Sequence, residues 1–318
     1  MKKFIAFILF FICLSPQSVL AAQTLIPGGQ VIGMELASDN LTVAAVHETL
    51  GKNAKAAGIQ PGDTLMAING TQVHTLEDVQ KILSTCGKDL RVTLRRGDKE
   101  KTVTFQCAET PQGQRLGLYL KQSITGIGTV TWYDPQTGSF GALGHGVSTP
   151  EGDLLTLHRG TVYSARVDKL RKGQPGDPGQ LLGTLSQTQS IGTLEKNTPQ
   201  GVFGKLPATE ETALQTGSRE EVHTGAATIR STVNGDGVQE YSVEILKIYP
   251  TSTAAGRNML LRVTDRELLS ATGGIVQGMS GSPIIQDGKL IGAVTHVLVN
   301  DPTTGYGIFI ENMLDAAA

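Results

Sequence analysis

From about residue 123 onward the chain carries short runs of apolar and β-branched residues and almost no helical periodicity. Residues 128–133, 161–167 and 226–233 are typical of these runs, and turn-forming residues such as 234–237 separate them. Strands at this spacing predict a sandwich or a barrel. The 39 glycines and the aromatic content of 5% also fit a loop-rich β protein better than a helical bundle. We therefore expect a mainly β fold.

The length and charge of the chain limit its organisation and its partners. At 318 residues it is long enough for two domains. Its net charge of −2 and the lack of a basic block argue against nucleic acid as a partner.

The N-terminus has the pattern of an export signal. Lys2 and Lys3 precede an apolar run over residues 4–14, and small residues follow at 19–22. The run is shorter than the ~20 residues that a transmembrane helix needs. We expect residues 1–22 to be a signal peptide, with an uncleaved signal anchor as the alternative. In both cases the rest of the chain is expected to be exported from the cytoplasm.

Three cysteines are present, and none has the spacing of a metal ligand. Cys13 falls in the signal segment, which leaves Cys86 and Cys107 as a pair. In an exported protein this pair could form a disulfide or stay free, and the sequence does not decide between the two. With no CxxC motif or Cys/His pair, we predict no zinc site and no cofactor.

Residues 54–105 have the turn and cap signals of a small α+β domain. The turn Pro61–Gly62–Asp63 leads into a strand that ends at Asn69–Gly70, a hairpin signal. Thr75 with Asp78 predicts the start of a helix, and Leu76, Val79 and Leu83 fall on one face of it. Alternating residues at 90–95 and 101–105 predict a closing hairpin.

Residues 56–63 and 68–70 resemble the signature of the PDZ domains of secreted proteases. Such domains take up a peptide as an added strand and hold its C-terminal carboxylate on backbone amides. The resemblance implies a PDZ domain over 28–108, a linker over 109–122 and a second domain over 123–318. The carboxylate-binding loop would be Val31, Ile32, Gly33 and Met34. The helical wall of the groove would be Leu76, Val79 and Leu83, although these three could also be plain core residues.

Residues 278–283 place a serine in a glycine-rich turn. Gly278 and Gly281 flank Ser280 and allow positive φ and close approach of a substrate, and Pro283 directs the chain into a strand. A serine held in this way can attack a carbonyl, with the amides of Gly278 and Ser280 as an oxyanion hole. The alternative is a glycine-rich hairpin with incidental serines. The pattern is not the nucleophile elbow of α/β-hydrolases, because Ser282 stands where that motif needs glycine.

A nucleophilic serine needs a base and a residue that orients the base. Of six histidines, His145 is flanked by glycines on both sides and is the predicted general base, whereas His296 lies in an apolar strand and reads as a core or edge residue. Asp265, 15 residues before Ser280, is the predicted acid, with helix capping as its alternative. Asp168 and Asp177 are further candidates for the acid.

Residues 141–146, 274–283 and 292–302 resemble the sporulation stage IV protein B peptidases, which are serine peptidases with a PDZ domain. The resemblance extends over nearly the whole chain. It implies a chymotrypsin-like double β-barrel with the catalytic order His145, Asp265, Ser280. The short interval from Asp265 to Ser280 departs from ordinary chymotrypsin-like enzymes, in which the acid belongs to the first barrel.

The resemblance also implies a biological setting. The protein would be exported into the space between mother cell and forespore, as a secreted or membrane-anchored peptidase. There it would cleave itself, with self-association in trans, and a membrane-bound regulatory partner. That cleavage would activate an intramembrane protease that processes a pro-sigma factor. The rival hypothesis is a non-catalytic PDZ adaptor or scaffold at the membrane surface.

Overall fold

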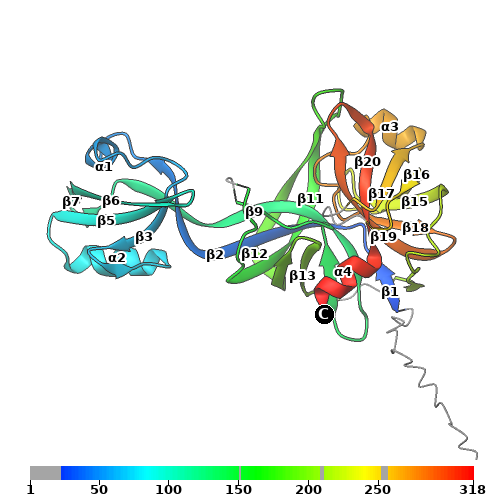
Figure 1. Cartoon of the computed structure of the whole chain (residues 1–318), viewed down its shortest axis with the longest axis horizontal. Helices are drawn as coiled ribbons and strands as arrows, with labels where there is room; N and C mark the ends of the chain where they lie inside the picture. Colours follow the sequence, from blue (N-terminus) through cyan, green and yellow to red (C-terminus); the bar gives the residue numbers. More distant parts are fainter. Residues whose placement is uncertain (1–22, 150–151, 208–210, 252–256) are drawn as a thin grey trace, which may run out of the picture.

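The structure is a computed structural model that describes residues 23–149, 152–207, 211–251 and 257–318. Figure 1 shows a small body and a larger β-rich body connected by a long two-stranded ribbon. The ribbon consists of β2 (Val31–Val46) and β9 (Leu118–Tyr133), which pair antiparallel along most of their length. The predicted export signal at 1–22 lies outside the described residues. Within the described ranges, no helix is long and apolar enough to cross a membrane.

The small body is the α+β domain expected from the sequence. Its sheet has the strand order β9–β2–β3–β5–β6, and a two-stranded sheet of β7 and β8 lies beside it. The elements that belong to it alone are α1 (Lys52–Ala56), β3 (Thr64–Ile68), β4 (Thr71–Gln72), α2 (Leu76–Thr85), β5 (Asp89–Arg96), β6 (Lys99–Gln106), β7 (Ala108–Thr110) and β8 (Gly113–Arg115).

The predicted start of α2 is confirmed. Thr75 Oγ1 accepts a hydrogen bond from the Asp78 amide at 3.1 Å, and the Asp78 carboxylate accepts one from the Thr75 amide at 2.9 Å. This reciprocal capping box satisfies two amides that the helix itself leaves without partners. Cys86, which follows α2, and Cys107 are free thiols, and Cys86 Sγ donates to Gln114 Oε1.

The first half of the large body is a closed ring of six strands. Going round the ring the strands are β9, β10 (Ser139–Ala142), β13 (Gly201–Lys205), β12 (Gln180–Thr198), β11 (Arg159–Arg171) and β2, which pairs again with β9. Phe140, Val162 and Val202 are fully buried inside this ring. Beside it, β1 (Thr24–Pro27) pairs with β9 and with β14 (Leu214–Gln215).

The second half is a closed barrel of six strands. In order around the barrel these are β15 (Gly225–Ser231), β16 (Gln239–Ile248), β17 (Met259–Val263), β20 (Asp301–Phe309), β19 (Lys289–Leu298) and β18 (Pro283–Gln286). The helices α3 (Arg266–Thr272) and α4 (Ile310–Ala317) follow β17 and β20. The mainly β prediction, with an α+β domain before two barrels, is therefore confirmed (Figure 1).

The predicted boundaries between the domains need correction. Residues 31–37 pair with β9 and residues 32–37 also pair with β11, so they belong to the first barrel and not to a domain that spans 28–108. The predicted linker at 109–122 contains the β7–β8 hairpin and the start of β9, which pairs with residues 42–46 of the small domain. Both errors arise because β2 and β9 each belong to two domains, which is a property of pairing and not of local sequence.

A buried carboxylate holds the turn that begins β3. Asp63 is 1% exposed and accepts hydrogen bonds from Arg96 Nε at 2.6 Å, from Arg96 Nη2 at 2.8 Å and from the Gln60 amide at 3.0 Å. Burial alone would raise the pKa of Asp63, but the bonds from Arg96 and Gln60 outweigh it and hold the pKa below its ordinary value. The ionised form is therefore the one that stabilises the fold.

Asp63→Asn is expected to lower the free energy of unfolding of the small domain by about 2 kcal/mol at pH 7, because charge-assisted bonds are lost. Since the folded pKa is depressed, this difference is full above pH ~4 and shrinks as the pH falls further. Urea unfolding followed by hydrogen exchange of the β3 and β5 amides measures it. Asp98→Asn in the exposed β5–β6 turn is the matched control. If the difference in unfolding free energy between wild type and Asp63→Asn did not change with pH, ionised Asp63 would not be the form that stabilises the fold.

Candidate active site

Ser280 lies in the loop between α3 and β18, and the flanking glycines are required there. Gly278 has φ of +101° and Gly281 has φ of +97°. A Cβ at Gly281 would lie 2.1 Å from the Thr129 carbonyl oxygen, so no other residue fits without movement of the backbone. The Gly281 amide donates to the Val294 carbonyl at 2.7 Å, which fixes the loop against β19.

The first barrel clamps this loop of the second barrel. Thr129 and Thr131 of β9 are both 0% exposed. The Thr129 hydroxyl donates to the Gly278 carbonyl at 2.8 Å, its amide donates to the Ser280 carbonyl at 3.2 Å, and the Thr131 hydroxyl donates to the Gly281 carbonyl at 2.8 Å. Sequence reasoning missed both threonines, because a threonine inside a strand carries no signal of its own.

The peptide between Gln277 and Gly278 has a fixed orientation. The Gln277 carbonyl accepts a hydrogen bond from the Leu181 amide of β12 at 2.8 Å. In a trans peptide the N–H points opposite to the carbonyl, so the Gly278 amide faces away from β12. Among the described residues, no hydrogen bond occupies the amide of Gly278 or of Ser280. Both amides are therefore available as the predicted oxyanion hole.

His145 projects from the tight turn that follows β10. Leu143 and Gly144 have φ of +70° and +68°, and His145 Nδ1 lies 2.9 Å from the Gly146 carbonyl oxygen. A carbonyl only accepts, so Nδ1 carries the proton and Nε2 is free to act as a base. Burial lowers the pKa of His145, although the bond to Gly146 opposes this effect. The ring is therefore neutral at pH 7.

His145 and Ser280 line one cavity of about 340 Å³. The hydroxyl of Ser280, however, donates to the Thr295 carbonyl at 2.7 Å and not to His145. Catalytic hydrogen bonds are often formed only when substrate is bound, so a shared cavity is the relevant observation here. Rotation of the Ser280 side chain is needed to move the hydroxyl away from Thr295.

A second imidazole lies against His145. The ring centroids of His145 and His296 are 5.3 Å apart, with an angle of 39° between the planes. Burial, then the neighbouring His145 and Arg257, lower the pKa of His296 to about 4. His296 Nδ1 is buried and has no hydrogen-bond partner in the described part of the chain. The residue predicted as a core or edge histidine thus contacts the predicted base, which the sequence pattern did not indicate.

Asp265 is the N-cap of α3. Its carboxylate accepts from the Leu268 amide at 2.9 Å and from the Ser242 amide at 3.4 Å. Asp168 is bonded to Thr184 and Arg166, and Asp177 to Arg171. Within the described ranges, no contact joins any of the three acids to His145. The structure supports the capping alternative for Asp265, and its role as a catalytic acid stays a prediction without a supporting contact.

A cavity at the position expected for the peptide groove lies between α2 and the start of β9. It is a cavity of about 220 Å³ whose helical wall contains the predicted Leu76, Val79 and Leu83. Val79 also belongs to the core, whereas Leu76 is 39% exposed. The opposite wall comes from the end of β8 and the start of β9: Arg115, Leu116, Gly117, Leu118, Tyr119 and Leu120.

The predicted carboxylate-binding loop at Val31, Ile32, Gly33 and Met34 is wrong. These residues lie inside the first barrel, and their backbone is paired with β9 on one side and β11 on the other. This stretch of backbone is part of the first barrel and does not border the cavity beside α2. The loop at the groove is instead Leu116–Gly117–Leu118, where Gly117 has φ of +72°. A glycine between leucines after the helix was the available signal, but it fell in the predicted linker.

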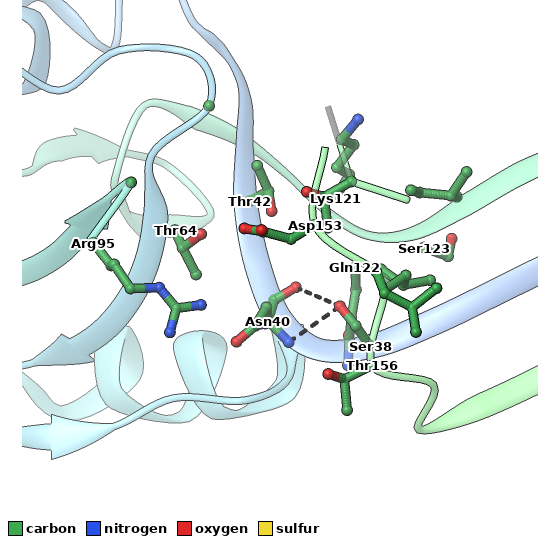
Figure 2. A pocket seen from close by; sticks show the side chains of 16 residues that line it. Ser38, Asn40, Thr42, Thr64, Arg95, Lys121, Gln122, Ser123, Asp153 and Thr156 are labelled. Carbon is green, nitrogen blue, oxygen red and sulfur yellow. Dashed lines mark hydrogen bonds between the residues drawn. The ribbon is translucent and has the colours of Figure 1, made fainter. Parts of the chain in front are cut away.

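A third, polar cavity lies where the small domain meets the first barrel, and Figure 2 shows the side chains that line it. Its volume is about 180 Å³. Ser38 Oγ and the backbone of Asn40 are hydrogen-bonded at 3.3 Å on its floor. Its charged lining residues are Arg95, Lys121 and Asp153. None of the predicted site residues is among its described lining residues, so it is separate from the candidate chemistry. No group of three metal-ligating side chains was found in the part of the chain that the structure describes.

Comparison with known proteins agrees with this geometry. Residues 112–314 match the family described as SpoIVB peptidase S55, and residues 50–96 match the PDZ domain. A histidine and a glycine-framed serine at one cavity between two barrels, behind a PDZ domain, define a serine peptidase of the PDZ-containing class. The chain belongs to the SpoIVB peptidase S55 family.

Curated relatives match shorter parts of the chain. The putative zinc metalloprotease mll0638 of Mesorhizobium japonicum is 35% identical over 80 residues, which are 25% of this chain and 22% of that protein. The putative zinc metalloprotease Atu1380 of Agrobacterium fabrum is 34% identical over 158 residues, which are 47% of this chain and 40% of that protein. The chain thus spans less than half the length of either relative.

Solved proteases match the chain at low identity and low TM-score. The active form of the Rv3671c protease from M. tuberculosis is 18% identical with a TM-score of 0.38, over 61% of this chain and 75% of that chain. The HtrA-type protease AlgW with a decapeptide is 14% identical with a TM-score of 0.37, over 65% of this chain and 56% of that chain.

Asp265→Ser and Asp265→Ala separate the two roles of this residue. Serine caps a helix but cannot stabilise an imidazolium, so Asp265→Ser should keep peptidase activity within about threefold if Asp265 only caps α3. Asp265→Ala should lower the free energy of unfolding by about 1 kcal/mol. Unfolding curves and peptide hydrolysis of both variants provide the measurements. A folded Asp265→Ser protein with activity reduced about 10⁴-fold would restore the catalytic assignment.

Proposed function

We propose that the chain is an exported serine endopeptidase whose nucleophile is Ser280 and whose general base is His145. The observation that carries the proposal is the single cavity that both residues line, together with Gly278. The two residues come from different barrels, and hydrogen bonds from Thr129 and Thr131 of the first barrel hold the loop of Ser280, which is the kind of fixed arrangement that positioned catalysis requires.

The chemistry follows from the free nitrogen of His145. Nε2 removes the proton of the Ser280 hydroxyl while Oγ forms a bond to the scissile carbonyl carbon. The negative charge moves to the carbonyl oxygen, where the amides of Gly278 and Ser280 donate to it. Collapse breaks the C–N bond, and the imidazolium gives its proton to the departing amine. Water, deprotonated by the same nitrogen, then hydrolyses the acyl-enzyme.

The resting arrangement favours controlled turnover. The hydroxyl of Ser280 must leave the Thr295 carbonyl, and such a hydrogen bond contributes about 1 kcal/mol. The Gly146 carbonyl holds the tautomer of His145, but a neutral carbonyl stabilises an imidazolium less than a carboxylate does. A peptidase that reacts slowly until substrate binding releases the serine suits the cleavage of a few regulatory proteins better than general degradation.

The PDZ domain is proposed to bind C-terminal peptides in the groove beside α2. At residues 118–121, β9 pairs with β2 on one edge, and among the described residues no strand pairs with its other edge. That edge faces the groove, so a peptide could add there as a strand. The glycine loop at Gly117 would hold the carboxylate, and Leu76, Leu83 and Leu116 would surround its last side chain.

The biological setting is also a proposal. The motifs at 141–146, 274–283 and 292–302, the family match and the lysine-led apolar N-terminus support export into the space between mother cell and forespore. There the peptidase would cleave itself, including another copy in trans, and a membrane-bound regulatory partner. The result would be activation of an intramembrane protease that processes a pro-sigma factor.

The second candidate is a non-catalytic PDZ adaptor. The bond from Ser280 to Thr295 favours it, because the hydroxyl does not meet His145 in this structure. Both candidates bind peptides, but only the peptidase reacts covalently with a serine-directed fluorophosphonate. That reaction at Ser280 decides between the two.

Ser280→Ala and His145→Ala should each lower kcat by at least about 10⁴-fold, and Ser280→Ala should end fluorophosphonate labelling. Labelling followed by peptide mapping, and mass spectrometry of cleaved products, measure both effects. His158→Ala is the matched control, because His158 is exposed, contacts Asp39 and does not line the cavity. Full hydrolysis by the Ser280→Ala protein would end the proposal.

The pH profile tests the environment of His145. The base acts in its neutral form, and burial lowers its pKa below the ordinary 6.5. The acidic fall in kcat/KM should therefore be centred below pH 6.5, with activity kept at pH 6.5 and above. A profile centred above pH 6.5 would mean that the imidazole is paired with an anion and not with a carbonyl.

Leu76→Asp tests the groove. Because Leu76 is an exposed apolar wall residue, a charge there should weaken binding of a peptide with an apolar C-terminal residue by about tenfold or more. Fluorescence anisotropy measures the affinity, and amidation of the peptide C-terminus should also weaken binding. Lys81→Asp, on the exposed face of α2, is the control. Equal affinity for the Leu76→Asp and Lys81→Asp proteins would place the site elsewhere.

A further inference from the structure

The cavity beside Ser280 is apolar. Its wall contains Met34, Leu36, Ile124, Ile127, Leu143 and Val147, and its polar side chains are His145, Ser148, Gln277 and Ser280. None of its described lining residues is charged. At about 340 Å³ it is roughly twice the size of a 150 Å³ cavity that accepts benzene. The space therefore suits a whole aliphatic or aromatic side chain.

A missing side chain on the β2–β9 ribbon creates this space. Met34 pairs directly with Gly126, and Leu36 pairs with Ile124, so these four positions share one face of the ribbon. A Cβ built on Gly126 meets no atom within 4 Å, and Gly126 is not among the glycines with positive φ. Neither packing nor backbone geometry requires a glycine here. A side chain at this position would extend over Met34 into the cavity.

Gly128, two residues further along β9, is a useful contrast. A Cβ at Gly128 would lie 2.3 Å from Leu143 and 2.5 Å from Met34, so this glycine is required by packing. Glycine inside a strand otherwise weakens it, and often marks a place where a ligand approaches closely. The two glycines on the same face thus have different roles. Gly128 allows the wall of the cavity to pack closely, and Gly126 leaves open space in the cavity.

We propose that this cavity is the specificity subsite of the peptidase, which takes an apolar side chain next to the scissile bond, with Gly126 setting the size limit. The inference rests on the proposed peptidase function. A charged side chain would lose its water here without gaining a partner, so lysine, arginine, aspartate and glutamate are excluded from this position. Large apolar residues such as leucine, methionine and phenylalanine fill the space and are preferred.

Gly126→Leu and Gly126→Ala test the subsite in the full chain. Cleavage of a mixed peptide library, read by mass spectrometry on both sides of the cut, gives the preference of the wild type. The wild type should cut beside large apolar residues. Gly126→Leu should lower kcat/KM for these peptides at least tenfold, keep alanine-containing peptides within threefold, and thus reverse the preference. Gly126→Ala should give a side-chain preference between those of the wild type and Gly126→Leu. It keeps the test possible if the Gly126→Leu protein fails to fold.

Gly87→Leu is the matched control, because a Cβ at Gly87 also meets no atom within 4 Å but the residue lies in the PDZ domain. Fluorophosphonate labelling of Ser280 is measured in every variant, since this small reagent does not need the subsite. The subsite is overturned if the Gly126→Leu protein is labelled but keeps the wild-type cleavage preference. It is also overturned if the wild type prefers charged residues. In both cases the proposed peptidase function still stands. If the wild type shows neither labelling nor cleavage, both the subsite and the peptidase function are overturned.

Discussion

The antiparallel pairing of β2 with β9 is the constraint on which the rest of the structure depends. Residues 31–37 pair with 123–129 inside the first barrel, and residues 42–46 pair with 118–121 inside the PDZ domain. The register changes between Ala37 and Thr42, which is where the chain passes from one body to the other (Figure 1). Neither body could close without this ladder, because each uses the same two strands as part of its sheet.

The candidate active site is a consequence of the same strand. At the end of the ladder, β9 supplies the buried hydroxyls of Thr129 and Thr131, which hold the carbonyls of Gly278 and Gly281. A buried hydrogen bond is strong when both partners are satisfied, so these contacts fix the loop of Ser280 to the barrel that carries His145. Ser280 and His145 therefore line one cavity because one strand contacts both barrels, and no single barrel contains the candidate site.

Local signals in the sequence were sufficient for local structure. The capping box at Thr75 and the glycines beside Ser280 could be predicted because their reasons lie within a few residues of each. The carboxylate loop could not, because residues 31–34 look like a PDZ strand until their pairing partners are known. Asp265 shows the same limit: the sequence allowed both a catalytic acid and a helix cap, and in the structure its carboxylate accepts hydrogen bonds from the amides of Leu268 and Ser242.

The length of β9 also relates the two binding surfaces to each other. Its start, Leu118–Leu120, is a wall of the peptide groove, and Gly126 borders the cavity beside Ser280. Eight residues of strand separate Leu118 from Gly126, which at ~3.4 Å per residue is on the order of 27 Å. A chain end held in the groove therefore cannot lie in the cavity as well. Under the proposed function, a substrate anchored by its C-terminus in the groove would have its scissile bond several residues upstream of the anchored end.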